Sequence, residues 1–179
     1  ALTMGDPSGV GTEIAIRAKI KKIKKPDFFI IHDVDFVKKI LIKMKSKLKV
    51  REISSPSEVK KLPKNYLAVL PIKIRKNTQL GKKNLTNIKS ILASIDLAVK
   101  LAKNGEVAAI VTNPINKDVI GKKIKNFKGH TEYLAKKDRT NDQLMMMMNK
   151  NLKTIPLTTH IAINKAVSYT HLTLPTTTI

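Results

Sequence analysis

Two adjacent side chains in this sequence could bind a polar ligand or move a proton. The segment "FKGHTEYLA" places His130 and Thr131 directly after Gly129. A histidine and a threonine hydroxyl at a helix start can bind a phosphate or a hydroxylated substrate, and histidine is the usual general acid or base near neutral pH. The plainer alternative is that Thr131 caps a helix and His130 is a surface ring.

Three further histidines are candidates for binding a metal. His160 ends the apolar segment "PLTTHIAI", and His171 follows in the similar context "SYTHLTLP". A neutral imidazole at a strand end can bind a divalent metal, but a metal site needs three or four ligands. His32 follows "FFII", and Asp33 and Asp35 beside it form no recognisable ligand spacing. The absence of cysteine excludes thiolate metal sites, cysteine nucleophiles and disulfides.

A glycine-rich turn, "TMGDPSGVGTEI", opens the chain. Gly5, Gly9 and Gly11 allow a sharp turn and a close approach to a ligand, and the start of the next helix offers unpaired N–H groups. The segment is not the dinucleotide fingerprint, because no third glycine follows, and it is not a Walker loop, because no Gly-Lys-Ser/Thr follows. A purely structural turn is the more frequent role of such a segment.

A fourth motif, "VTNPINKDVIG", runs from an apolar strand into a proline. Thr112 or Asn113 can cap the next helix, with Pro114 near its first position. The functional alternative is a loop at a strand end that presents Asn113, Asn116 and Lys117 to a polar ligand. The sequence favours neither alternative over the other.

The elements that must position these motifs follow from the apolar patterns. Strand and helix alternate, which predicts an α/β fold with a largely parallel central sheet. In such sheets ligands gather at the carboxyl ends of strands, where the motifs stand. The predicted strands cover residues 1–4, 27–33, 47–53, 66–72, 106–112, 144–148 and 153–160, and the clearest helices cover 12–22, with Thr12 as N-cap, 34–45 and 84–103.

Composition limits the classes of function. The chain has 179 residues, 42% of them hydrophobic, which indicates a globular protein. The net charge of +22 would attract polyanions, but nearly all the basic residues are lysines and aromatic residues make up only 4%, which disfavours specific nucleic-acid binding. We expect a cytoplasmic protein without a membrane partner, because the sequence has no apolar run long enough to span a bilayer and no signal peptide.

Taken in order, GDPSGVGTE, VTNPINK, GHTEYLA and TTHIAI closely resemble the 4-hydroxythreonine-4-phosphate dehydrogenases of pyridoxal phosphate (vitamin B6) biosynthesis. The resemblance covers residues 1 to about 166, and Thr12 stands where the family usually has proline. It implies a fold related to the isocitrate and isopropylmalate dehydrogenases and a homodimer with its site between subunits. The implied reaction is NAD-dependent oxidation of a secondary alcohol in 4-phosphooxy-L-threonine, followed by decarboxylation to 3-amino-2-oxopropyl phosphate.

The resemblance also implies roles for individual residues. His130 and Thr131 match positions that bind the small phosphorylated substrate. His160 matches the first of three histidines that hold a divalent metal (Zn, Mg or Co), which lowers the pKa of the alcohol and then polarises the new carbonyl. No residue of this chain is matched to a catalytic role or to NAD.

Other features of the family are missing from this sequence. The segments with the other two metal-binding histidines do not occur in it, and we therefore expect a truncated enzyme with little or no dehydrogenase activity. Residues 1–166 are expected to be the N-terminal part of the dehydrogenase and residues 167–179 a tail foreign to the family. Two alternatives stay open: a related dehydrogenase that acts on another phosphorylated or hydroxylated acid, and a basic polyanion-binding protein.

Overall fold

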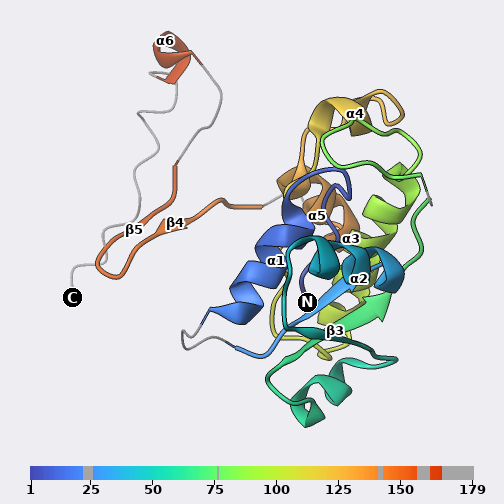
Figure 1. Ribbon diagram of the computed structural model, residues 1–179. Helices are drawn as coiled ribbons and strands as arrows, with labels where there is room; N and C mark the ends of the chain where they lie inside the picture. Colours follow the sequence, from blue (N-terminus) through green and yellow to red (C-terminus); the bar gives the residue numbers. More distant parts are fainter. Residues whose placement is uncertain (22–25, 76, 141–142, 157–161, 167–179) are drawn as a thin grey trace. The chain divides into compact units, whose positions relative to one another are not determined.

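The computed structural model describes residues 1–21, 26–75, 77–140, 143–156 and 162–166 (Figure 1). The chain forms two compact units, Ala1–Thr140 and Asn141–Ile179. Across the described residues, no helix is both long enough and apolar enough to cross a membrane.

A parallel sheet forms the centre of the first unit. Its strands lie in the order β1-β3-β2, and each neighbouring pair is parallel. The register places Ile30 opposite Val69 and Val50 opposite Leu67. The predicted fold class, α/β with a largely parallel sheet, is confirmed by these strands: β1 (Phe29–His32), β2 (Lys49–Glu52) and β3 (Tyr66–Pro71).

Two short segments extend this sheet beyond β1. The backbone N–H of Leu2 donates to Phe29 O at 3.0 Å, and the N–H of Val111 donates to Ala1 O at 2.8 Å. Leu2 and Val111 form single parallel bridges, where the sequence predicted strands over 1–4 and 106–112. Val111 is 59% exposed, so the apolar run that ends at this residue is not buried on both faces as expected.

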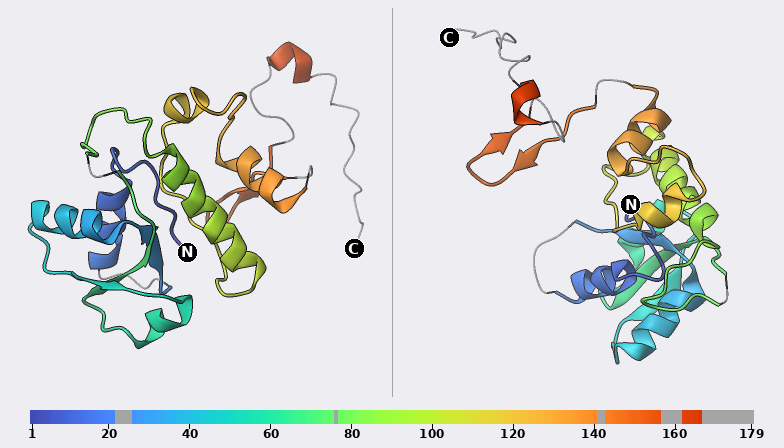
Figure 2. Two further views of the ribbon diagram at one scale, coloured as in Figure 1. Left: turned by 90° about the vertical axis from the view of Figure 1, so that its right-hand side faces the viewer. Right: turned by 90° about the horizontal axis from the view of Figure 1, so that it is seen from above.

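Successive residues of a strand point to opposite sides of the sheet. Because β1 is buried at every position, helices cover both faces. Ile30 packs in one cluster with Ile16 and Val37, whereas Ile31 packs in another with Ala98. The helices behind the first cluster are α1 (Gly11–Ile20) and α2 (Val34–Lys43), and the helix behind the second is α3 (Ile88–Lys103) (Figure 2).

Local capping sets the helix starts. Asp33 caps α2, its Oδ1 accepting the N–H of Phe36 at 3.0 Å. Helix α1 begins one residue earlier than predicted: Val10 is its N-cap, and Thr12 lies inside the helix rather than capping it. Helix α3 begins at Ile88, four residues later than predicted. The first unit also contains η1 (Pro56–Lys61), α4 (Lys117–Gly121) and α5 (His130–Asp138).

The second unit contains little regular structure among its described residues. Strands β4 (Met147–Met148) and β5 (Lys153–Thr154) form a two-stranded antiparallel sheet, and α6 covers Ile163–Ala166. Both strands are shorter than predicted, and residues 157–160 of the second predicted strand lie outside the described residues. The pairing is antiparallel, so among the described residues parallel strands occur only in the first unit.

Candidate active site

The glycine-rich turn packs directly against the loop that follows Val111. Gly5 has a φ of 69°, and a Cβ on it would lie 2.6 Å from the Cβ of Asn113 and 2.8 Å from the carbonyl oxygen of Pro114. The N–H of Asp6 donates to this same carbonyl at 2.9 Å. A side chain at position 5 would therefore separate the two motifs, and the glycine is required by contacts within the protein itself.

Asn113 locks the two segments together. Its backbone N–H donates to the Thr3 hydroxyl at 3.2 Å, and its Nδ2 donates to the Thr3 carbonyl at 3.0 Å. The residue is 3% exposed, and a Cβ on Gly11 would lie 3.1 Å from its Cβ. These contacts favour the structural role for Asn113 over the presentation of its amide to a ligand.

Asn116 caps the helix that follows. Its Oδ1 accepts the N–H of Val119 at 3.1 Å, which makes Asn116 the N-cap of α4. The structural alternative drawn from the sequence named Thr112 or Asn113 for this role, and neither residue has it, because the helix begins only at Lys117. Lys117 then becomes the first residue of α4, with an exposed side chain.

Ser8 places a buried hydroxyl inside the glycine-rich turn. Its N–H donates to Asp6 Oδ1 at 2.9 Å, and its carbonyl accepts the N–H of Gly81 at 2.7 Å. The residue is 5% exposed, and within the described part of the chain its Oγ has no hydrogen-bond partner. Buried polar groups are normally paired, so this hydroxyl is a candidate ligand contact that the sequence did not single out.

His130 begins α5 and stands beside Lys117. A Cβ on Gly129 would lie 3.2 Å from both Cε and Nζ of Lys117, so the lysine side chain crosses the backbone just before His130. The Nε2 of His130 is buried and, among the described residues, has no hydrogen-bond partner. Thr131 is exposed and is the second residue of the helix, so the alternative in which it caps α5 is not supported.

The surroundings of His130 favour its neutral form. Burial lowers the pKa of the ring, and the positive charge of Lys117 lowers it further. A neutral imidazole has one N–H donor and one acceptor nitrogen, so His130 can donate to a ligand oxygen or accept a ligand proton.

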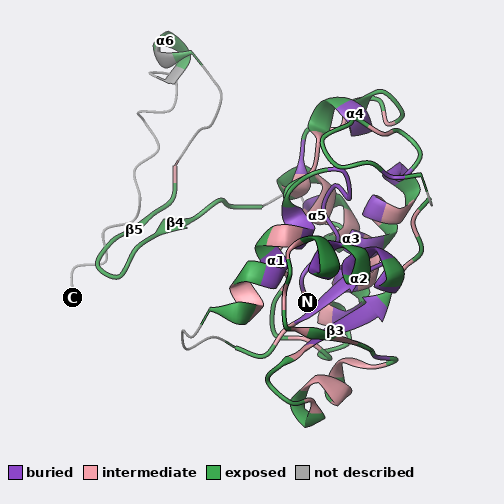
Figure 3. Ribbon diagram, in the orientation of Figure 1, coloured by how far each residue is buried: buried purple, intermediate pink, exposed green. Residues whose placement is uncertain are grey.

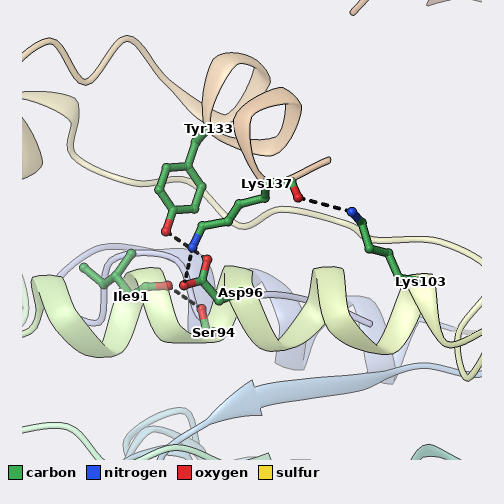
Figure 4. A network of polar contacts seen from close by, with 6 residues as sticks. All are labelled: Ile91, Ser94, Asp96, Lys103, Tyr133 and Lys137. Carbon is green, nitrogen blue, oxygen red and sulfur yellow. Dashed lines mark hydrogen bonds and ion pairs between the residues drawn. The ribbon is translucent and has the colours of Figure 1, made fainter. Parts of the chain in front are cut away.

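Polar contacts attach α5, the helix that begins with His130, to α3 (Figure 4). The hydroxyl of Tyr133 donates to Asp96 Oδ1 at 2.8 Å, and Lys137 Nζ lies 2.8 Å from Asp96 Oδ2. Burial, together with the hydrogen bond to Asp96, raises the pKa of Tyr133. Lys103 adds a hydrogen bond to the Lys137 carbonyl at 3.2 Å. These bonds fix the orientation of α5 on the core.

His32 is buried among protein groups at the end of β1. Its Nδ1 accepts the N–H of Asp33 at 2.7 Å, which leaves Nε2 to carry the proton and donate to the Thr12 hydroxyl at 3.0 Å. The ring stacks on Phe36, and burial lowers its pKa to about 4. Both nitrogens are satisfied, which favours a structural role. The threonine at position 12, where the resemblance expects proline, supplies this partner.

The predicted metal ligand lies outside the described residues. This applies to His160, to His171 and to the whole segment 167–179. The described residues contain no group of three or more His, Asp or Glu side chains that could hold a metal ion. The metal-binding role of His160 and the foreign origin of residues 167–179 therefore stay predictions.

A basic cavity lies beside the amino ends of the strands of the parallel sheet. Its volume is about 1120 Å³, and apolar residues such as Phe28 and Leu48 contribute to its lining. The basic residues around it are Arg17, Lys19, Lys21, Lys45, Lys47 and Lys64, with Asp27 as the acidic one. Six of the basic residues of the chain thus line a cavity that does not include His130.

The chain matches the family of the pyridoxal phosphate biosynthetic protein PdxA over residues 24–177. It is 32% identical over 169 residues to the 4-hydroxythreonine-4-phosphate dehydrogenase of Trichlorobacter lovleyi, an alignment that covers 91% of this chain and 50% of that protein. It is also similar to a crystal structure of the enzyme of the same name from Klebsiella pneumoniae. That comparison gives a TM-score of 0.84 and 27% identity, and covers 93% of this chain and 52% of the other.

A second solved structure shows the same similarity. The 4-hydroxythreonine-4-phosphate dehydrogenase of Burkholderia phymatum matches with a TM-score of 0.81 at 27% identity, over 93% of this chain and 51% of that one. The chain thus spans about half the length of the curated relatives it matches.

Proposed function

The chain belongs to the PdxA family of pyridoxal phosphate biosynthetic proteins, and we propose that it supplies part of the substrate site of a 4-hydroxythreonine-4-phosphate dehydrogenase. The proposed reaction is NAD-dependent oxidation of 4-phosphooxy-L-threonine and its decarboxylation to 3-amino-2-oxopropyl phosphate. The protein is proposed to act in the cytoplasm as a homodimer, as the resemblance of its motifs implies.

The observation that carries this proposal is the environment of His130. Its Nε2 is buried and has no partner in the described part of the chain, while the cationic Lys117 stands next to it. Thr131 adds an exposed hydroxyl on the same helix turn. A neutral imidazole, an ammonium and a hydroxyl together provide the donors that a phosphorylated hydroxy acid needs. His130 and Thr131 are therefore proposed to bind and orient the substrate.

The reaction requires a hydride acceptor and, in the family, a metal. NAD would accept the hydride from the secondary alcohol carbon. The described residues do not fit the metal, because they offer no group of three ligands, and they do not form a clear NAD cradle, because Asn113 fills the space beside Gly5 and Gly11. We therefore assign no step through either group to the described residues.

The test is turnover by the natural protein that contains this chain. NADH formation is measured with 4-phosphooxy-L-threonine, NAD and Mg²⁺, Zn²⁺ or Co²⁺, beside a panel of other phosphorylated and hydroxylated acids. We expect 4-phosphooxy-L-threonine to be the preferred substrate and His130→Asn to raise KM. Preference for another acid of the panel would overturn the substrate assignment in favour of a related dehydrogenase.

A further inference from the structure

Lys117 places a positive charge beside a second basic side chain. It is the first residue of α4, a helix of five residues, and it is exposed. It also lies close enough to His130 to lower the pKa of that ring. No residue in the described part of the chain forms an ion pair with Lys117. A lysine held beside another basic group, with no acidic partner among the described residues, needs an anion to balance its charge.

The backbone around Lys117 leaves room for its side chain to reach the site. Gly129 has no Cβ, and one placed there would lie 3.2 Å from Lys117 Nζ and 3.6 Å from Glu132 Oε2. The lysine side chain therefore passes over Gly129 toward the start of α5. Gly129 also provides no side-chain cap for α5, so the first amides of this helix keep their capacity to donate.

Resting on the function proposed above, we propose that Lys117 is a further substrate-binding residue whose ammonium pairs with the phosphate group at the His130–Thr131 site. A phosphate has several acceptor oxygens and about two negative charges near neutral pH. It can accept from the ammonium, from the Thr131 hydroxyl and from the uncapped amides of α5 at once. A single carboxylate offers fewer acceptors and less charge, so the phosphate suits this set of donors better.

The experiment compares three variants of the 179-residue chain. Lys117→Gln removes the proposed contact. Lys122→Gln is the matched control, because Lys122 is an exposed lysine at the other end of α4. Glu132→Gln tests whether Lys117 acts only by balancing the negative charge of Glu132. Binding of 4-phosphooxy-L-threonine and of inorganic phosphate is followed through the ring NMR signals of His130, assigned with His130→Asn, and circular dichroism checks that each variant folds.

The expected result is a selective loss of affinity. Lys117→Gln should weaken binding of 4-phosphooxy-L-threonine roughly tenfold or more, because a charge-assisted hydrogen bond is lost, whereas Lys122→Gln and Glu132→Gln should stay within about twofold. The same Lys117→Gln substitution should raise the pKa of His130, a change that is independent of any ligand. Its melting temperature should stay the same, because Lys117 forms no ion pair with the described residues that the substitution could remove.

Other results would overturn the proposal in distinguishable ways. Equal binding by Lys117→Gln and the unsubstituted chain refutes the role of Lys117 and leaves the proposed enzyme function untouched. An equal loss of affinity for 4-hydroxy-L-threonine, which lacks the phosphate, would assign Lys117 to the carboxylate instead. If neither phosphate ligand shifts the His130 signals of the unsubstituted chain, Lys117 does not bind phosphate there. The turnover assay still decides the proposed function by itself.

Discussion

Similar apolar sequences are buried in one unit of this chain and exposed in the other. In the first unit, β1 and the centre of β3 are buried, with Ile30 at 0% exposure. In the second unit, Met147 and Met148 of β4 are 56% and 70% exposed (Figure 3). Strand β1 has helices packed on both faces of its sheet, whereas β4 and β5 form a sheet of two short strands. An apolar strand is thus buried only where a second layer covers it.

The comparison predicts where the folding free energy resides. A two-stranded sheet is marginally stable by itself in water, whereas a sheet covered on both faces forms a core. Substitutions in the first unit should therefore change stability strongly, and substitutions in β4 should not.

The largest expected effect comes from truncating the centre of the core. Ile30→Ala should lower the free energy of unfolding by about 4 kcal/mol, because it leaves a cavity between β1, α1 and α2. The matched change in the second unit, Met147→Ala, should cost less than about 0.5 kcal/mol. Urea denaturation followed by circular dichroism measures both. Similar losses in the two variants would contradict the distinction between the units.

A substitution in the glycine-rich turn tests whether the tight packing extends to the candidate site. Gly5→Ala should cost about 3 kcal/mol, because a left-handed backbone acquires a Cβ that also overlaps Asn113. Gly81→Ala is the control, because Gly81 has a similar φ of 78° but nothing within 4 Å of its Cβ position. It should cost about 1 kcal/mol. Equal costs in thermal melts would mean that Asn113 yields to the new side chain.

Acid should destabilise the first unit through His32. Its pKa falls from 6.5 in the unfolded chain to about 4 in the folded protein. The unfolded state therefore binds a proton first, and stability is lost as the pH falls from 6.5 toward 4, by about 3 kcal/mol in total. Urea melts at neutral pH and near pH 4 measure the loss.

The His32→Gln variant provides the control for this pH dependence. It should be less stable near neutral pH, because the bond to Thr12 and the stacking on Phe36 change. Its stability should fall less steeply between pH 6.5 and 4 than that of the unsubstituted chain. An unchanged slope would show that other groups cause the acid sensitivity.

The smallest expected effect concerns the attachment of α5. Tyr133→Phe removes the hydrogen bond to Asp96 and should cost about 1 kcal/mol. Tyr66→Phe is the matched change, because no hydrogen bond of the Tyr66 hydroxyl is found in the described part of the chain, and it should cost close to nothing. Thermal melts of the two variants decide the point. A loss of stability in Tyr66→Phe as large as in Tyr133→Phe would show that the hydrogen bond to Asp96 is not the cause.

Much of the fold could be predicted because short-range patterns determine it. The helical spacing of apolar residues located α2 to within two residues of its end at Lys43, and the apolar runs located β1 and β3. The alternation of strands and helices correctly predicted a parallel sheet. The strand expected over 106–112 did not form as predicted. Its sequence is apolar, but only Val111 pairs with the sheet, and that residue is exposed.

The candidate site could be predicted only in part. The motif singled out His130 and Thr131, whose role in substrate binding stays a prediction. It did not single out Ser8, because an unpaired hydroxyl is visible only when its neighbours in space are known. The partnership of Thr12 with His32 was missed for the same reason, since twenty residues of chain separate them.

By itself, the sequence determined the family and the α/β class, and it singled out the candidate site residues, because motifs and periodicity are properties of residues close together in the chain. Only the tertiary structure decided that Asn113 locks the turn, that Asn116 caps α4 and that Lys117 passes over Gly129 beside His130. The contact of Asn113 with Thr3 joins residues 110 positions apart, and Lys117 meets Gly129 only because the chain folds back after α4. The cap by Asn116 is local, but its position depends on where the loop after Val111 gives way to a helix.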